Sequence, residues 1–227
     1  MGRFLGLSVA ALSMILLAGG HARAAVVTFL GADNSVSSLA QMTNSTAAET
    51  AFSAAVPGAS TITFETSLPS GVSVSGGSTT NNSGCGALCG FNTTPGGQFF
   101  YLLEAGSATF TFSTPINAFG MYITGLQTDL VPQETLTFFD GSQQTINTPT
   151  STGGGGAFVG FTDFGQSIVS VTYNATNDIV SLDDVLYSGA SVSSVPLPGA
   201  LPLFATGLGA LGLLGWRRNR KAAALAA

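Results

Sequence analysis

The sequence predicts an all-β protein: an antiparallel, jelly-roll-like β-sandwich with one short helix, preceded by a signal peptide and followed by a C-terminal transmembrane helix. Three observations predict this architecture. Residues 25–189 are rich in Thr, Val, Phe and Ser and poor in Leu and Lys, a composition that favours strands. Runs of alternating apolar residues recur there at intervals of about 8–15 residues. Each end of the chain carries an apolar segment beside basic residues.

Residues 1–24 have the features of a secretory signal peptide. Arg3 provides a positive start, residues 4–18 form an apolar run, and Ala22-Arg23-Ala24 matches the small-x-small pattern that precedes cleavage. We therefore expect a mature N-terminus near Ala25. An uncleaved membrane anchor is the alternative, but the run is short for a bilayer core of about 30 Å.

The C-terminal part predicts a membrane anchor. Residues 190–195 form a small-residue linker, and residues 199–216 contain no charge. Counted from Pro196, the apolar segment is long enough to span a bilayer, and together with the basic tail it occupies residues 196–221. Basic residues follow the segment directly: Arg217, Arg218, Arg220 and Lys221. The positive-inside tendency therefore leaves the tail in the cytoplasm and places residues 25–189 outside.

Positive and negative charges are separated along the chain. All six Lys and Arg residues lie near the two ends, whereas all eleven acidic residues lie between Asp33 and Asp184. The only histidine, His21, also lies outside residues 25–189. A domain without cations cannot neutralise phosphates, which excludes nucleic-acid binding. Catalysis by histidine and zinc sites with histidine ligands are excluded for the same reason.

Local patterns predict the individual elements of the middle domain. Alternation of apolar residues indicates strands, and Asp140-Gly141 predicts a hairpin turn before residues 143–146. Residues 104–106 are expected to turn in a similar way between residues 99–103 and 108–112. The strand candidates are residues 61–64, 108–112, 116–124, 134–139 and 167–173.

One helix and two loops complete this expectation. Thr46-Ala47-Ala48-Glu49 matches a capping box, which predicts a short helix that ends at Pro57-Gly58. Residues 75–82 and 153–156 are expected to be loops.

Cys85 and Cys89 lie in a Gly-rich stretch of a chain that we expect to be exported. This setting predicts a disulfide bond between them. A redox motif would have two intervening residues rather than three, and a zinc site would need further Cys or His ligands.

Adjacent carboxylates at Asp183 and Asp184 lie in a strand-like run, so we expect their side chains on opposite faces, with one of them partly buried. A buried carboxylate needs a partner, and the domain offers no Lys or Arg. The remaining solutions are backbone N–H groups, hydroxyls, a raised pKa or a bound cation such as Ca²⁺, which favours oxygen ligands. The alternative is that Asp183 and Asp184, and Glu65 with them, are solvated at strand ends.

Catalysis would also have to use carboxylates. A glycoside hydrolase needs two of them at a defined separation, and Glu65, Glu104 and Glu134 are the residues considered for this role. No sequence pattern brings any two of them together, so we expect a non-enzymatic domain. Glycan binding would use aromatic platforms, but the strand positions indicate that most tyrosines pack in the interior; the tyrosines are Tyr101, Tyr122, Tyr173 and Tyr187.

Val195-Pro196-Leu197-Pro198 comes directly before the apolar segment, and an Arg-rich tail follows that segment. This order of a short Pro-containing motif, an apolar helix and a basic tail resembles the PEP-CTERM sorting signal and places the sorting motif, helix and tail in residues 196–221. The family's usual motif has Glu at the position of Leu197, and the form found here, followed by Leu201-Pro202-Leu203, resembles a variant. The resemblance implies an exported bacterial protein whose tail is recognised by exosortase, a membrane processing enzyme. It also implies an association with the cell surface, exopolysaccharide and biofilm.

The middle domain resembles the jelly-roll ectodomains of such sorted proteins, on residues 62–65, 111–120 and 182–187. Similar jelly rolls hold a structural Ca²⁺ with one acidic residue after the first core strand and another in the last strand. The resemblance therefore implies Glu65 and either Asp183 or Asp184 as calcium ligands.

Taken together, these features predict an exported protein of the cell envelope, cell surface or extracellular matrix, structural or adhesive and non-enzymatic, with no certain cofactor. The expected partners are an exosortase-type enzyme, the membrane and exopolysaccharide. A calcium-dependent carbohydrate-binding module is the first alternative, and a carboxylate-pair glycoside hydrolase is the second.

Overall fold

Strand β6 (Gly106–Leu126) belongs to both layers of the fold. The computed structural model describes residues 25–130 and 134–189. The first half of β6 pairs with β10 (Ile168–Thr176), and its second half pairs with β11 (Val180–Gly189). Pro115 lies between the two halves. Because proline cannot donate to a ladder, its position suits the bend that carries the strand from one sheet to the other.

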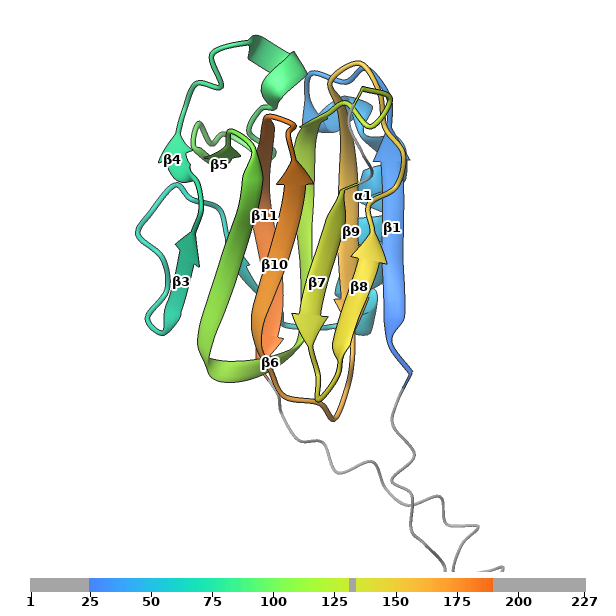
Figure 1. Cartoon of the computed structure of the whole chain (residues 1–227), viewed down its shortest axis with the longest axis vertical. Helices are drawn as coiled ribbons and strands as arrows, with labels where there is room; N and C mark the ends of the chain where they lie inside the picture. Colours follow the sequence, from blue (N-terminus) through green and yellow to red (C-terminus); the bar gives the residue numbers. More distant parts are fainter. Residues whose placement is uncertain (1–24, 131–133, 190–227) are drawn as a thin grey trace, which may run out of the picture.

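All strand pairs are antiparallel, and the strands form a two-layered β-sandwich (Figure 1), as the sequence predicts. One sheet has the order β3-β6-β10-β7-β8 and contains the first half of β6. Its other strands are β3 (Val72–Ser75), β7 (Thr135–Phe139) and β8 (Gln143–Asn147).

The second sheet contains the second half of β6. β9 and β1 continue it on one side, and β11 continues it on the other. β2 and β5 both pair with the free edge of β11, one after the other, and β4 pairs with β5. These strands are β1 (Val27–Asp33), β2 (Ser60–Ile62), β4 (Ser78–Thr80), β5 (Phe100–Leu103) and β9 (Gly155–Thr162).

Aromatic side chains fill the space between the sheets. Phe138 of β7 stacks on Phe161 of β9 with ring centroids 3.9 Å apart, and Phe110 and Phe119, from the two halves of β6, lie 5.4 Å apart. These four side chains are almost completely buried. Contacts between large rings from facing sheets contribute both apolar burial and favourable ring geometry, so this layer is the main core of the domain.

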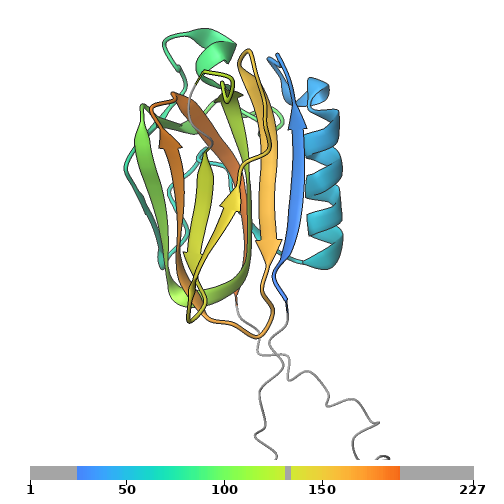
Figure 2. The ribbon, with the colours of Figure 1, turned by 45° about the vertical axis from the view of Figure 1, so that its right-hand side comes forward.

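Helix α1 (Thr43–Ala55) covers the outer face of the second sheet (Figure 2). Phe52 is fully buried there, with ring centroids 5.5 Å from Phe29 and 5.8 Å from Phe158. The helix approaches β1 closely at Gly31, where an added Cβ would contact the Asn44 carbonyl oxygen. Two short 3-10 helices, η1 (Leu39–Gln41) and η2 (Gly86–Cys89), lie in the connections.

The predicted helix is present, but it begins three residues before the predicted capping box. No side chain of its own N-cap residue, Met42, caps the helix. Asp33 at the end of β1 performs this role instead: Oδ1 accepts from Asn44 N at 3.0 Å and Oδ2 from Ser45 N at 2.9 Å. Glu49, predicted to reach back to the helix start, accepts from Ser53 one turn further on. A tertiary cap has thus replaced the local one.

Most predicted strands are confirmed, including the hairpin at Asp140-Gly141 between β7 and β8. The predicted loop at residues 75–82 was wrong in part, because it contains β4, and the predicted loop at 153–156 contains the start of β9. The turn at 104–106 exists, but β5 and β6 do not pair with each other, because β11 lies between them.

Several predictions fall on residues that the structure does not describe. The signal peptide, the linker, the sorting motif, the apolar segment and the basic tail all lie outside residues 25–130 and 134–189. Among the residues described, no helix combines the length and hydropathy needed to cross a bilayer.

Candidate functional site

The two adjacent carboxylates lie at a bulge in β11. Asp183 pairs with Tyr122 and Leu186 with Gly120, so three steps along β11 match two along β6. Asp184, inside this irregularity, has a φ of 42°, a left-handed conformation. We expected Asp183 and Asp184 on opposite faces because side chains alternate along a regular strand, and the bulge interrupts this alternation. Both carboxylates consequently contact the same pair of residues in another loop.

That pair is Thr93-Thr94. Asp183 Oδ2 accepts from the backbone N–H groups of Thr93 at 2.7 Å and Thr94 at 3.2 Å. Asp184 accepts from their hydroxyls: Thr93 Oγ1 lies 2.9 Å from Oδ2, and Thr94 Oγ1 lies 2.8 Å from Oδ1. The Asp pair thus accepts from backbone and side-chain donors of both threonines.

The two carboxylates of the Asp pair are buried or half-buried with no Lys or Arg beside them in the described part of the chain, and this burial is the main influence on their pKa values. Asp183 is only 1% exposed, and its Oδ1 has no hydrogen-bond partner among the described residues. Burial, together with the neighbouring Asp184 charge, raises the pKa of Asp183 to about 7, although the Thr93 and Thr94 N–H groups act in the opposite direction. Burial also raises the pKa of Asp184. Backbone donors, hydroxyls and a raised pKa, three of the four expected solutions, are all used.

Glu65 contacts the same loop at its other end. Its Oε1 accepts from Asn92 Nδ2 at 3.0 Å and from the backbone N–H groups of Gln98 and Phe99 at 2.7 and 2.8 Å. Residues 92–99, which we call the clamped loop, are therefore held by Glu65 and by the Asp pair. The three predicted calcium ligands face one loop. Asp183 and Asp184 share the threonine hydroxyls as donors, whereas the donors to Glu65 are different residues of the loop.

The fit of a metal ion can be judged from these donors. In the described part of the chain, no three His, Cys, Asp or Glu side chains are grouped so that they could hold one ion. One oxygen of Glu65, one of Asp183 and both of Asp184 already accept from N–H or O–H groups, whereas Asp183 Oδ1 is buried without such a donor among the described residues. Calcium binding by Glu65, Asp183 and Asp184 stays a prediction.

An open groove runs between the clamped loop and the start of α1. Its wider part has a volume of about 640 Å³ and its inner part about 230 Å³. Leu39, Thr46 and Pro95 line both parts, so the two are continuous. The wider part is otherwise lined by Ser38, Ala40, Met42, Thr43, Asn92, Thr93 and Thr94, and the inner part by Glu49, Thr61, Tyr122, Asp184 and Leu186.

The inner end of the groove is acidic. Glu49 and Asp184 lie there, together with the Tyr122 hydroxyl, which is hydrogen-bonded to the Thr46 side chain. Burial, with contributions from the surrounding carboxylates, raises the pKa of Tyr122 to about 12, so the phenol keeps its proton at neutral pH. The groove therefore offers hydroxyls, carboxylates and an apolar wall, a lining that suits an uncharged or cationic ligand better than an anion.

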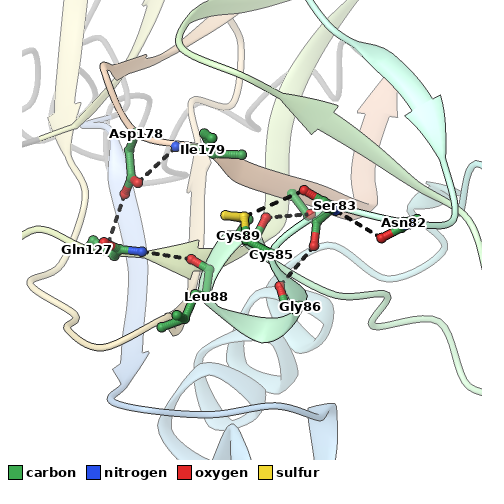
Figure 3. The surroundings of a disulfide bond; sticks show 11 residues. Asn82, Ser83, Cys85, Gly86, Leu88, Cys89, Gln127, Asp178 and Ile179 are labelled. Atoms are coloured by element: carbon green, nitrogen blue, oxygen red, sulfur yellow. Dashed lines mark hydrogen bonds between the residues drawn. A yellow bond between two sulfur atoms is a disulfide. The ribbon is translucent and has the colours of Figure 1, made fainter.

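The disulfide bond between Cys85 and Cys89 is present, as predicted. Figure 3 shows how its loop is attached to the sandwich: Gln127 Nε2 donates to the Leu88 carbonyl at 2.9 Å, and Gln127 N donates to Asp178 Oδ2 at 2.9 Å. The bond therefore stabilises a loop that is also tied to the end of β6.

The carboxylates considered for catalysis lie in three different settings. Glu65 holds the clamped loop, and Glu104 is exposed in the connection from β5 to β6. Glu134 is fully buried, and burial, followed by the interaction with Asp178, raises its pKa to about 9, so that its carboxyl is protonated at neutral pH.

The tyrosines mainly serve packing, as expected. Tyr101 stacks on Phe64 and its hydroxyl accepts from Gly77 N at 2.7 Å, while Tyr173 is fully buried in the core. Tyr187 packs against Phe112.

Sequence reasoning missed Asp33 as the helix cap and Thr93-Thr94 as the partners of the Asp pair. The Thr-Thr-Pro-Gly-Gly run at residues 93–97 is a turn signal, but no local pattern links it to residues 90 positions away.

Comparison with known proteins identifies no relative by sequence: no protein family model and no curated protein matches the chain. Solved structures give distant likenesses. The catalytic unit of a thermostable GH87 α-1,3-glucanase from Streptomyces thermodiastaticus strain HF3-3 is 15% identical, with a TM-score of 0.36 over 62% of this chain and 28% of the glucanase chain.

Two carbohydrate-binding modules are similarly distant. TmCBM61, solved with β-1,4-galactotriose, is 12% identical with a TM-score of 0.32, over 56% of this chain and 94% of the module. A mutant of the family 29 module CBM29-2 is 9% identical with a TM-score of 0.34, over 62% of this chain and 97% of the module. Likenesses this weak assign the chain to no family and transfer no function to it.

Proposed function

We propose that the chain is an exported protein of the bacterial cell surface or extracellular matrix, and that its jelly-roll-like β-sandwich is structural or adhesive rather than enzymatic. The observation that carries this proposal is the separation of charge: every cation lies near an end of the chain, beside an apolar segment, and residues 25–189 hold none. A signal peptide and a PEP-CTERM-like anchor explain both ends at once.

The disulfide supports export, because such bonds persist mainly in oxidising compartments outside the cytosol. The expected partners follow from the C-terminal motif: an exosortase-type enzyme that recognises residues 195–198, the membrane that receives the apolar segment, and exopolysaccharide around the cell.

Mass spectrometry of both ends of the mature protein, combined with cell fractionation, tests the proposal. We expect an N-terminus near Ala25 and the protein in the envelope or matrix fraction. A matched variant with Gln at Arg217, Arg218, Arg220 and Lys221 should lose this retention, whereas Asn219→Gln should not. A full-length chain with both ends intact in the cytosol would contradict the proposal.

Carbohydrate binding, calcium-dependent or not, is the second candidate, and the groove beside the clamped loop favours it. Hydroxyl, amide and carboxylate groups line the groove beside the apolar side chains of Leu39 and Pro95, a mixture that can hydrogen-bond the hydroxyls of a saccharide while covering its apolar face. The acidic inner end favours neutral or amino sugars over uronates.

A glycan array with calcium and with a chelator tests this candidate. We expect binding to neutral or amino glycans, weakened by Asp184→Asn and unchanged by Asp129→Asn, an exposed residue that does not line the groove. Dependence on calcium would support the metal site, whereas an array without any signal in both conditions would exclude the candidate. Cleavage of a bound glycan would overturn the non-enzymatic assignment.

A further inference from the structure

The two ends of the described domain lie at the same end of the sandwich. In β1, the first residue, Val27, pairs with Thr162 at the end of β9, and the last residue of β11, Gly189, pairs with Ile116 at the bend of β6. Figures 1 and 2 show the chain entering and leaving together at this end, beside the β7–β8 turn and the β9–β10 connection. We call it the exit end. The opposite end carries η2 and its disulfide.

Exposed apolar side chains gather at the exit end. Phe139, the last residue of β7, is 56% exposed, and Phe164, in the β9–β10 connection, is 43% exposed. Val27 and Val169 at the same end are also about half exposed. Of the eight large hydrophobic residues exposed in the described part of the chain, half therefore lie at this one end. Such a concentration marks an interaction surface.

Exposed charge has the opposite distribution. The acidic residues of the two loops at the exit end, Asp140 and Asp163, are only 6% and 1% exposed. Glu104 and Asp129 are exposed, and they lie at the opposite end, in the β5–β6 connection and after the end of β6. Both ends expose apolar side chains, including Leu88 and Leu130 at the opposite end, but only the opposite end also carries the exposed carboxylates Glu104 and Asp129. The two ends therefore differ in charge, and the exit end is the one that carries exposed aromatic residues in loops whose acids are buried.

We propose that the exit end rests on the lipid bilayer, with Phe139 and Phe164 inserted into the interfacial region. This inference depends on the proposed function, because it requires the apolar segment from Pro196 onward to span the membrane. The linker from residue 190 to residue 195 has six residues and reaches at most about 20 Å. The exit end is therefore tethered close to the bilayer, where aromatic side chains partition favourably. Anionic headgroups would repel the acidic end, which favours the same orientation.

Fluorescence quenching in nanodiscs tests this contact with the full chain. In a Trp216→Phe background, which removes the only tryptophan, Phe139→Trp places a single fluorophore at the exit end. Leu130→Trp is the matched control, since Leu130 is exposed and follows the end of β6 at the opposite end of the sandwich. Both substitutions exchange one exposed apolar residue for another, so the fold should persist.

We expect lipids brominated on their acyl chains to reduce the fluorescence of Phe139→Trp and to leave that of Leu130→Trp unchanged. Equal quenching at the two sites, or none at either, in a chain that is held in the nanodisc overturns the orientation and leaves the anchor intact. A chain that does not enter nanodiscs overturns the membrane anchor and, with it, the contact.

Discussion

Replacing Asp183 by Asn should remove one of the main contributions to the pH dependence of stability. The substitution keeps the shape of the side chain and an oxygen that accepts from the N–H groups of Thr93 and Thr94, but it removes the ionisable group. In the folded protein, burial and the Asp184 charge raise the pKa of Asp183 to about 7 from a usual value of 3.8. The folded state therefore holds a proton that the unfolded state releases at lower pH.

The sign and size of the effect follow from this difference. Because the folded pKa is the higher one, the stability associated with Asp183 is fully present below about pH 4 and is lost as the pH rises to about 7. At about 1.4 kcal/mol for each pKa unit, the loss over this interval is about 4 kcal/mol. Asn stays neutral throughout, so the variant should not lose this contribution.

Urea denaturation of both proteins across this pH range measures the effect. We expect the free energy of unfolding of the wild type to fall relative to that of Asp183→Asn as the pH rises from about 4 to about 8. Glu134 also contributes to the pH dependence, but it is present in both proteins and cancels in the comparison. Parallel curves for the two proteins would refute the reasoning, because they would mean that Asp183 has the same pKa in the folded and unfolded states.

Three further substitutions test the packing. Asp33→Ala should lower the free energy of unfolding at neutral pH by about 1–2 kcal/mol, measured by urea denaturation, because α1 loses its cap. This loss should be smaller at low pH: burial raises the pKa of Asp33, but the hydrogen bonds from Ser45 and Asn44 outweigh it and hold the pKa below its usual value. An equal loss at all pH values would contradict the capping role. Replacing Cys85 and Cys89 together by Ser should cost about 2 kcal/mol, measured as a lower Tm. Phe52→Ala should cost about 3–5 kcal/mol, and a loss below about 1 kcal/mol would show that α1 packs loosely.

The fold was largely predictable because its determinants are local. Apolar alternation identified β10 and both halves of β6, and Asp140-Gly141 identified the β7–β8 hairpin. Which strands pair with each other was harder to predict from the sequence. β5 and β6 follow each other in the sequence with a short turn between them, yet β11 separates them, because pairing depends on residues about 80 positions away.

The candidate site was only partly predictable. The absence of cations indicated which partners buried carboxylates would need, and the structure supplies N–H and hydroxyl donors at Asp183 and Asp184. The bulge that turns both side chains toward Thr93-Thr94 has no signal in the sequence, because a left-handed conformation at an Asp is set by the surrounding ladder rather than by the residue. The groove is likewise formed by segments that only the fold brings together.

A domain built in this way should also respond to salt in an unusual direction. Residues 25–189 contain eleven carboxylates and no Lys, Arg or His, so salt cannot weaken ion pairs within them and can only screen repulsion between like charges. Two of the buried members, Asp183 and Glu134, reduce this repulsion through raised pKa values, whereas exposed acids such as Glu104 and Asp129 contribute to it. Moderate salt should therefore stabilise the domain at neutral pH, and it should do so less in acid, where the carboxylates are protonated. A domain stabilised by surface ion pairs would show the opposite trend.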